Sequence, residues 1–299
     1  MADIPFIRDY DFSYGHAEPQ SKLVSRITAD NPGPFTYTGT GVYMIGTNDV
    51  AIIDPGPITP AHTKALDKAL IGKTLTHILL THHHADHSPM AKPLAAKYGS
   101  KIYGCPPIDG SVDGSGVQMD AGDDPGFAPD VIIKDGDIFT GSDWTLETVH
   151  TPGHTSNHMC FALAEENTLF SGDHIMGWAT SVVIPPGGHM GDYLASLRKI
   201  KANNYDIIRP THGPAITEVK PFVTAYIDHR LEREEQVYGA LKSGHSVVMD
   251  IVTHIYTDID KRLYPAAAMS VLSHLIHLCE TQRAKCVGKM TLTGQYKPL

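Results

Sequence analysis

The fold of this chain is decided by one stretch of sequence, Thr76-His77-Ile78-Leu79-Leu80-Thr81-His82-His83-His84-Ala85-Asp86-His87. Its apolar start predicts a buried strand, and its second half gathers imidazole and carboxylate groups in a single turn. Alternation along the strand projects His82 and His84 to one side, whereas Asp86 and His87 lie just beyond the turn. Because one tetrahedral ion does not readily take four ligands from so short a loop, the spacing indicates a two-metal site, and two metals indicate hydrolysis.

Three later motifs place a histidine or an aspartate at the end of a predicted strand, next to glycine or proline. They are Thr151-Pro152-Gly153-His154, Ser171-Gly172-Asp173-His174 and Pro210-Thr211-His212-Gly213-Pro214. Loops that follow strands commonly carry functional residues. The alternative, a His-rich surface loop that binds stray metal, does not explain why potential ligands recur after successive strands.

Together with Asp54 in Ile52-Ile53-Asp54-Pro55-Gly56, these motifs resemble the five ordered motifs of the metallo-β-lactamase-fold superfamily, over roughly the first 215 residues. The resemblance implies an α/β (α+β) fold, an αββα sandwich with a metal site at one edge. It implies a first metal bound by His82, His84 and His154, a second bound by Asp86, His87 and His212, and Asp173 as the bridge between them. Asp54 is implied to be a structural residue beside the site.

The implied ligand set also suits a hydrolytic mechanism. Two cations lower the pKa of a bridging water toward neutrality, and the resulting hydroxide attacks a carbonyl or phosphorus centre. The same charges stabilise the oxyanion that develops, and Asp86 orients or deprotonates the nucleophile. Five histidines and two aspartates favour two zinc ions, although iron and manganese accept the same ligands.

Three further residues are candidates for supporting roles. His174 follows the bridging aspartate and is expected to orient a ligand or the substrate. His189, on a Gly/Pro-rich loop before a predicted helix, is a candidate substrate-binding or leaving-group donor, and Tyr193 is a candidate donor to an oxyanion. The competing interpretation of each is an ordinary packed or exposed side chain, which is common for His and Tyr.

Residue periodicity predicts the other elements of the first part. A hairpin joins Val42–Ile45 to Val50–Asp54, and helices are expected at Pro60–Leu70, Ser88–Tyr98 and Tyr193–Asn203. Residues 105–130 are rich in Gly, Asp and Pro, which predicts a loop insertion.

The pattern changes after Pro214. Helices are predicted at Pro221–Lys242, Val247–Tyr256 and Ala266–Glu280, followed by a short β-wing from Ala284–Lys289 and Met290–Leu292. This order predicts a catalytic domain at 1–216 and a winged-helix-like C-terminal domain at 217–299. The alternative is a helical cap that only packs on the catalytic domain.

The C-terminal residues 217–299 indicate a particular family within this superfamily. Stretches such as Gly172-Asp173-His174-Ile175-Met176-Gly177 and Tyr226-Ile227-Asp228-His229-Arg230 are similar to the β-lactamase-like protein 2 family, which joins a metallo-β-lactamase domain to a winged helix. Family members include an animal endoribonuclease that acts on single-stranded RNA. Many bacterial members have no assigned substrate.

Charge bears on the choice of substrate. The chain carries a net charge of −9; residues 217–299 contain ten Lys/Arg and nine Asp/Glu, a net of +1, which leaves −10 for residues 1–216. RNA binding draws on phosphate neutralisation, so the acidic first part favours a small carbonyl substrate: an ester, thioester, lactone or, promiscuously, a β-lactam. The alternatives are an endoribonuclease that cleaves single-stranded RNA and a non-catalytic nucleic-acid-binding or interaction protein.

Location and assembly are expectations from composition. The N-terminus lacks the basic start and apolar core of a signal peptide, and no apolar stretch approaches the ~20 residues of a membrane span. With few cysteines and no paired spacing, the sequence predicts a cytoplasmic protein without a membrane partner. Met, Leu and Ile on the predicted tail helices are candidates for a homodimer face.

Overall fold

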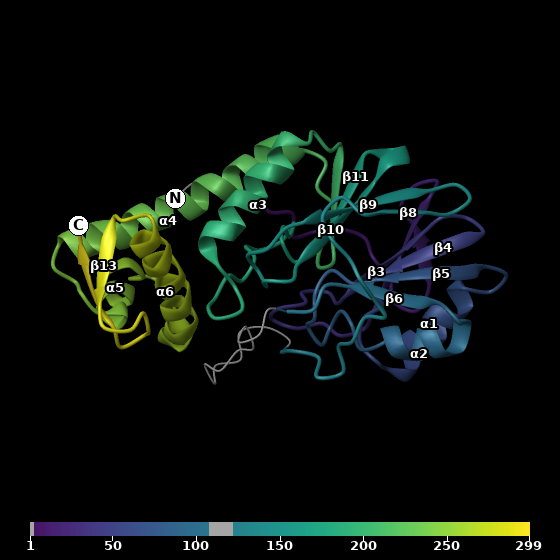
Figure 1. Ribbon diagram of the computed structural model, residues 1–299, viewed down its shortest axis with the longest axis horizontal. Coiled ribbons are helices and arrows are strands. Elements are labelled where there is room, and N and C mark those ends of the chain that lie inside the picture. Colours follow the sequence, from purple (N-terminus) through teal and green to yellow (C-terminus); the bar gives the residue numbers. More distant parts are fainter. Residues whose placement is uncertain (1–2, 108–121) are drawn as a thin grey trace.

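The computed structural model describes residues 3–107 and 122–299 and shows two stacked sheets with helices on both outer faces (Figure 1). The seven-stranded sheet follows chain order: β1 (Ala17–Pro19), β2 (Val24–Thr28), β3 (Gly41–Ile45), β4 (Asp49–Ile53), β5 (Thr74–Leu79), β6 (Lys101–Gly104) and β7 (Val131–Ile132). The five-stranded sheet has the order β12 (Ile207–Pro210), β11 (Thr168–Gly172), β10 (Met159–Leu163), β9 (Thr145–His150), β8 (Ile138–Thr140).

The central strands are apolar on both faces because both faces are covered. On β3, Tyr43 and Ile45 point into the core between the sheets, whereas Val42 and Met44 pack against helices. The same period of two is expected wherever a strand lies between two apolar layers. Trp144 and Phe161 close the inter-sheet core from the second sheet.

Four helices cover the sandwich. α1 (Pro60–Ala69) and α2 (Ala91–Tyr98) lie on the first sheet, and α3 (Met190–Ala202) lies on the second together with the first half of α4 (Val219–Lys242). Local sequence sets their ends. Thr59 caps α1 by accepting a hydrogen bond from the backbone N–H of His62, and α2 ends at Gly99 with a φ of 72°, the left-handed conformation that favours glycine.

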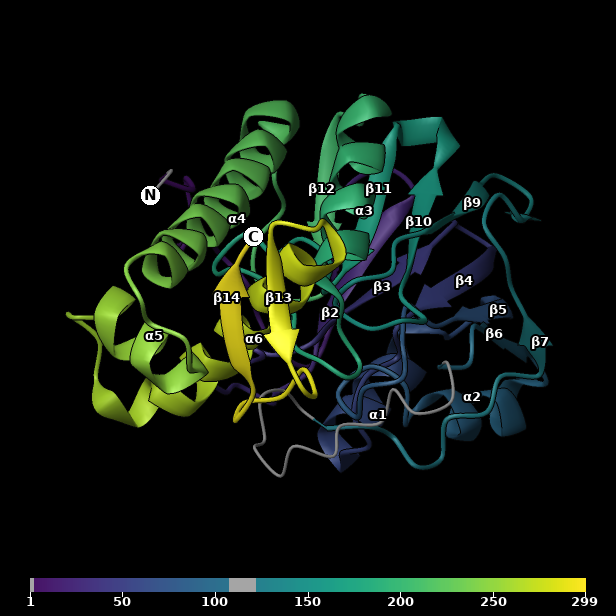
Figure 2. The same ribbon diagram turned by 60° about the vertical axis from the view of Figure 1, so that its left-hand side comes forward.

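The C-terminal part has its own small core. α5 (Val248–Ile255), α6 (Tyr264–Glu280) and the hairpin of β13 (Ala284–Val287) and β14 (Gln295–Pro298) pack on the second half of α4 (Figure 2). Short 3-10 turns occupy Ala164–Glu166 and Lys261–Leu263. Phe222 and Tyr226 of α4 pack on the sandwich and Val237 and Leu241 pack in the tail, so α4 is shared by both cores.

The expected αββα sandwich and winged-helix tail are confirmed. The second strand of the wing was predicted wrongly at Met290–Leu292; it forms at Gln295–Pro298. Tyr296, fully buried in the tail core, anchors the real strand, while Met290 and Leu292 are exposed in the turn. Of the predicted loop insertion, residues 108–121 lie outside the described residues. Within the described part of the chain, no helix combines the length and apolar character that a membrane span requires.

Candidate metal centre

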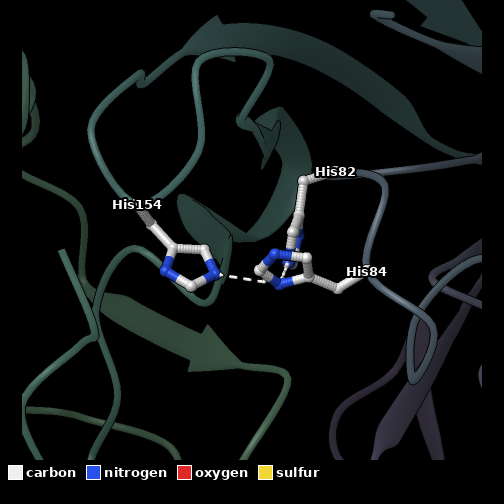
Figure 3. A group of neighbouring side chains, drawn as sticks. All are labelled: His82, His84 and His154. Carbon is white, nitrogen blue, oxygen red and sulfur yellow. Dashed lines mark hydrogen bonds between the residues drawn. The ribbon is translucent and has the colours of Figure 1, made fainter. Parts of the chain in front are cut away.

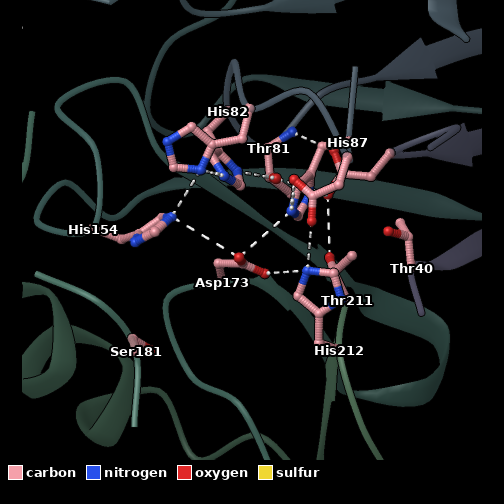
Figure 4. Close-up of polar contacts among 12 residues, drawn as sticks. Thr40, Thr81, His82, His87, His154, Asp173, Ser181, Thr211 and His212 are labelled. Carbon is pink, nitrogen blue, oxygen red and sulfur yellow. Dashed lines mark hydrogen bonds and ion pairs between the residues drawn. The ribbon is translucent and has the colours of Figure 1, made fainter. Parts of the chain in front are cut away.

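The seven expected ligands come together at one edge of the sandwich. Figure 4 labels His82, His87, His154, Asp173 and His212 among them. Each follows the carboxyl end of a strand: β5, β9, β11 or β12. These strands run in the same direction within their sheets, so their ends open at a common edge. All seven side chains are buried: His82, His84, Asp86, His87, His154, Asp173 and His212.

The first group consists of three imidazoles (Figure 3). His84 Nδ1 lies 2.9 Å from His82 Nε2 and 3.2 Å from His154 Nε2. Burial, followed by the charges of neighbouring imidazoles, holds the pKa of His82 and of His84 well below the usual 6.5. Three imidazole nitrogens that converge at hydrogen-bond distance are also a donor set that suits a cation.

In His82 and His154, the hydrogen bond made by Nδ1 determines that Nε2 faces the other imidazoles. His154 Nδ1 donates to the carbonyl of Val182 at 2.7 Å. Thr81 Oγ1 donates to Asp54 Oδ2 at 2.7 Å, so its lone pair accepts from His82 Nδ1 at 2.9 Å. Both histidines are therefore oriented with the Nε2 lone pair directed into the group, toward His84 Nδ1, as metal-ligating imidazoles require.

The second group mixes charges. His212 Nε2 lies 3.0 Å from Asp86 Oδ2, and His87 Nε2 lies 3.6 Å from Asp86 Oδ1. Asp173 stands between the groups: Oδ2 is 3.5 Å from His87 Nε2 and 3.9 Å from His154 Nε2, and Oδ1 is 3.4 Å from His212 Nε2. This position is the one expected of a bridging carboxylate.

Electrostatics in the second group run opposite to those in the first. Burial lowers the pKa of His87 and of His212, but nearby carboxylates outweigh it, so the pKa of His212 is raised and that of His87 is raised well above 6.5. Burial raises the pKa of Asp86, but the charges of His87 and His212 bring it down to about 2. Burial also raises the pKa of Asp173, but the charges of His212 and His87 hold it well below its usual range.

Asp54 contacts both groups, directly at His87 and through Thr81 at His82. Its Oδ2 accepts from His87 Nδ1 at 2.9 Å, from Thr81 Oγ1 and from Thr211 Oγ1, and its Oδ1 accepts from the Thr81 backbone N–H. Its φ of 48° is in the left-handed region, a cost that a non-glycine residue bears where the surroundings hold it in place. That Asp54 is a structural residue near the site, and not a ligand, stays a prediction.

The donor set fits a pair of divalent cations. His87 Nε2, His212 Nε2 and Asp173 Oδ1 are buried, and their close contacts in the described chain are the ion-pair contacts within the cluster, with no hydrogen bond of regular geometry. Buried polar atoms are rarely left without a partner. Imidazole nitrogen and carboxylate oxygen are suitable ligands for zinc and its neighbours, so a metal at each group would satisfy them.

One supporting residue, His158, escaped the sequence analysis. The Asp173 backbone N–H donates to His158 Nε2 at 3.2 Å, and the other ring nitrogen lies 2.9 Å from Thr151 Oγ1. A Cβ on Gly172 would come within 2.6 Å of His158 Nε2, so this ring also explains the glycine before Asp173. The signal available in the sequence was a histidine four residues after His154 and directly before the apolar run Met159–Leu163.

Two of the hypothesised catalytic residues have other partners. Tyr193 is fully buried, and its hydroxyl donates to the His174 carbonyl at 2.8 Å. Its backbone packs on Gly153, where a Cβ would lie 2.4 Å from Tyr193 Cα. His189 caps α3 through the Asp192 backbone N–H, and its Nε2 contacts Glu280 Oε2 of α6 at 2.8 Å. These contacts do not bring either side chain to the metal cluster.

The His174 ring is buried behind the site. Burial, followed by the charges of His154 and Arg230, lowers its pKa to about 3. Its ring centroid lies 4.6 Å from that of Tyr193, and neither ring nitrogen has a hydrogen-bond partner. The described contacts therefore give His174 a packing position next to the bridging aspartate, and its expected orienting role stays a prediction.

A small pocket opens beside the first group. It is lined by His83, His84, Asp123, His154, Thr155, Val182, Ile184, Pro185, Gly187 and Gly188. Asp123 Oδ1 lies 2.9 Å from His83 Nε2, and His83 Nδ1 faces Asn157 Oδ1 at 2.9 Å. The wall nearest the first metal group thus carries a carboxylate from the segment 105–130, which the sequence analysis predicted to be a loop insertion.

Comparison with known families matches both parts of the chain. Residues 38–212 match the family described as Metallo-beta-lactamase superfamily, and residues 248–291 match the Beta-lactamase associated winged helix domain. Both intervals agree with the two cores seen in the structure.

Relatives cover most of the chain. A Beta-lactamase-like protein 2 homolog of Caenorhabditis elegans is 34% identical over 90% of this chain and 89% of its own length. An Atrochrysone carboxyl ACP thioesterase of Cryptosporiopsis sp. is 34% identical over 77% of this chain and 66% of its own length. Among solved structures, a Beta-lactamase domain protein from Burkholderia ambifaria is 18% identical with a TM-score of 0.80, covering 97% of this chain and 96% of that chain, which supports the fold.

Proposed function

The chain belongs to the metallo-β-lactamase superfamily, with the associated winged helix, and we propose that it is a dinuclear zinc hydrolase of a small acyl substrate, most specifically a thioester. The observation that carries the proposal is the convergence of seven buried ligand side chains into two groups joined by Asp173.

The residues that would hold the two cations are those described above. His82, His84 and His154 would hold one, Asp86, His87 and His212 would hold the other, and Asp173 would serve both. When bound, two such cations make a water nucleophilic near neutral pH and stabilise negative charge on the attacked carbonyl. Zinc is proposed because nitrogen ligands outnumber oxygen ligands in the set.

The chain itself contributes position and proton transfer. Asp86 is the carboxylate of the second group, with Oδ1 toward His87 and Oδ2 toward His212. If one oxygen held the cation, the other would orient a water by accepting its hydrogen bond and then its proton. Hydrolysis then joins the water oxygen to the acyl carbon, breaks the carbon–sulfur bond and leaves the proton on the departing thiol. Burial of the whole cluster strengthens the electrostatic interactions within it.

The electrostatics of the pocket support a neutral carbonyl substrate over a polyanion. Asp123 lines the pocket beside the first group, and the chain as a whole carries a net charge of −9. A phosphodiester would bring further negative charge against this wall, whereas a thioester carbonyl would not. The thioesterase named among the relatives has the same chemistry.

The test is turnover by the full chain loaded with zinc, manganese or iron in separate preparations. Substrates are a panel of S-acyl-N-acetylcysteamine thioesters, lactones and a β-lactam, run beside the Asp86→Ala variant. We expect thioester hydrolysis that falls about 10²- to 10⁴-fold in the variant, the usual range for losing a proton-transfer group. Unchanged turnover in the variant would remove Asp86 from the mechanism.

Single-stranded RNA is the second candidate substrate, and one observation favours it. Residues 281–299 carry four Lys/Arg and no Asp/Glu, and Lys285 lies opposite Lys297 on the exposed hairpin. A basic ribbon of this kind suits phosphate contacts. Labelled single-stranded RNA therefore belongs in the same assay, and cleavage of RNA without thioester hydrolysis would replace the first proposal.

A further inference from the structure

The segment that follows the bridging aspartate is buried without regular secondary structure. Residues 174–184 run from Asp173 to the pocket wall, and Ile175, Met176 and Val183 in it are almost fully buried. Such a segment depends on neighbours for its shape, because its backbone groups lack a ladder of their own. Its neighbours are supplied by the helices that lead into and form the tail.

α4 binds this segment from behind at two points. The Tyr226 hydroxyl donates to the Met176 carbonyl at 2.7 Å and is also 2.5 Å from the Ala179 carbonyl. One turn further along α4, the Arg230 guanidinium donates to the Ser181 carbonyl. From the other side, Met269 of α6 packs against Ile184.

Arg230 is one of the buried arginines that donate to a backbone carbonyl, as Arg26 and Arg209 also do. It is 6% exposed, its guanidinium lies 5.2 Å over the Tyr193 ring, and no carboxylate pairs with it among residues 3–107 and 122–299. A buried arginine normally has an acidic partner. Here its strongest polar contact in the described chain is a backbone carbonyl, which indicates that holding this peptide is its role.

That peptide adjoins the carbonyl that orients a metal ligand. Ser181 precedes Val182, whose carbonyl accepts from His154 Nδ1 at 2.7 Å. Ser181 is held a second time, through its hydroxyl, by the His174 carbonyl at 2.9 Å. Fixing the Ser181 carbonyl therefore fixes the direction of the next carbonyl, which in turn fixes the His154 ring.

We propose that Arg230 is a positioning residue for the first metal group, acting through the Ser181–Val182 peptides on His154. The inference rests on the proposed role of His154 as a ligand and is independent of the substrate. On this proposal, α4 does more than pack against its neighbours. Through Arg230 it also sets the geometry of the first metal group and of the pocket wall at Val182.

The test is metal binding by the full-length, metal-free chain. Wild type, Arg230→Met and Arg230→Lys are titrated with zinc against a chromophoric chelator, and with cobalt to record the d–d spectrum. We expect Arg230→Met to weaken one of two sites about 10- to 100-fold, the usual effect of losing a residue that orients a ligand, and to leave the other unchanged. The cobalt spectrum should match that of His154→Ala and differ from that of Asp86→Ala.

Arg233→Met is the matched control, because Arg233 lies on the same helix with 8% exposure but stacks on Tyr256 of the tail at 4.2 Å. It should leave both affinities unchanged. Arg230→Lys should recover part of the lost affinity, since a lysine retains the charge and a donor; it also serves as the less disruptive variant if Arg230→Met does not fold.

Equal weakening of both sites, or no weakening, in folded Arg230 variants would overturn the inference. Loss of one site with the spectrum of Asp86→Ala would also contradict it. If wild type itself bound no pair of metals, the proposed function would fail, and that failure is seen before any Arg230 variant is measured.

Discussion

The two metal groups differ in the charge of their side chains. The first is three imidazoles with pKa values lowered at His82 and His84, and it contains no acid of its own. The second pairs His87 and His212 with Asp86, so that protons on the histidines balance the carboxylate. The first group is thus ready to bind a cation, whereas the second must exchange protons for it.

The largest expected effect comes from the residue that both groups share. Asp173→Ala should lower occupancy of both metals and abolish hydrolysis, because its two oxygens reach His87, His154 and His212. Metal content per chain after dialysis, measured by mass spectrometry, checks this. A variant that retains two metals and full turnover would show that Asp173 does not bridge.

The next effect separates the groups by pH. Because the pKa values of His87 and His212 are raised above 6.5, cation binding at the second group displaces protons, and its affinity should rise as pH rises through those pKa values. The expected slope is up to about tenfold per pH unit for each proton displaced. Chelator titrations on both sides of neutrality measure it.

The first group supplies the internal reference for that titration. The pKa values of His82 and His84 already lie well below neutrality, so its affinity should stay flat over the same range. If metal affinity rose equally with pH at both sites, the proposed difference between the two groups would be wrong.

A smaller effect is expected from Asp54→Asn. An amide cannot accept at both positions, so either His87 Nδ1 or the Thr81 N–H loses its acceptor. We expect affinity at the second group to fall about 10- to 100-fold, with circular dichroism confirming that the chain remains folded. If the first group weakens more than the second, the assignment of Asp54 chiefly to His87 is incorrect.

The smallest expected effect is that of Thr81→Val. This change keeps the shape but removes the hydroxyl that accepts from His82 Nδ1, while Asp54 retains its hydrogen bond from His87. Affinity at the first group should fall about tenfold, the lower end for such partners. The second group, read in the same titration, should be unaffected; a change there instead would contradict the separation of the two supports.

Much of the site could be predicted from sequence because its ligands are local signals. His82, His84, Asp86 and His87 lie in one turn, and Asp173 and His212 each follow a strand beside glycine or proline. Strand periodicity places these positions at sheet ends, and parallel neighbours bring the ends to one edge. The helices were also predicted from local periodicity, although some boundaries differ by a few residues: α2 was expected at Ser88–Tyr98 and forms at Ala91–Tyr98.

The parts that could not be predicted depend on contacts between distant segments. The orienting carbonyl of Val182, the support from His158 and the carboxylate of Asp123 carry no local pattern. His189 was hypothesised to act on the substrate because its loop precedes a helix; the structure uses it as the helix cap and as a contact to Glu280. The metal ligand roles, the domain boundary, self-association and cellular location stay predictions.

The most direct test of the central claim is anomalous diffraction at the zinc edge from crystals of the zinc-loaded chain. The account predicts two peaks, one among His82, His84 and His154 and one among Asp86, His87 and His212, with Asp173 between them. A single peak, or a peak at His83 and Asp123 in place of either group, would contradict it.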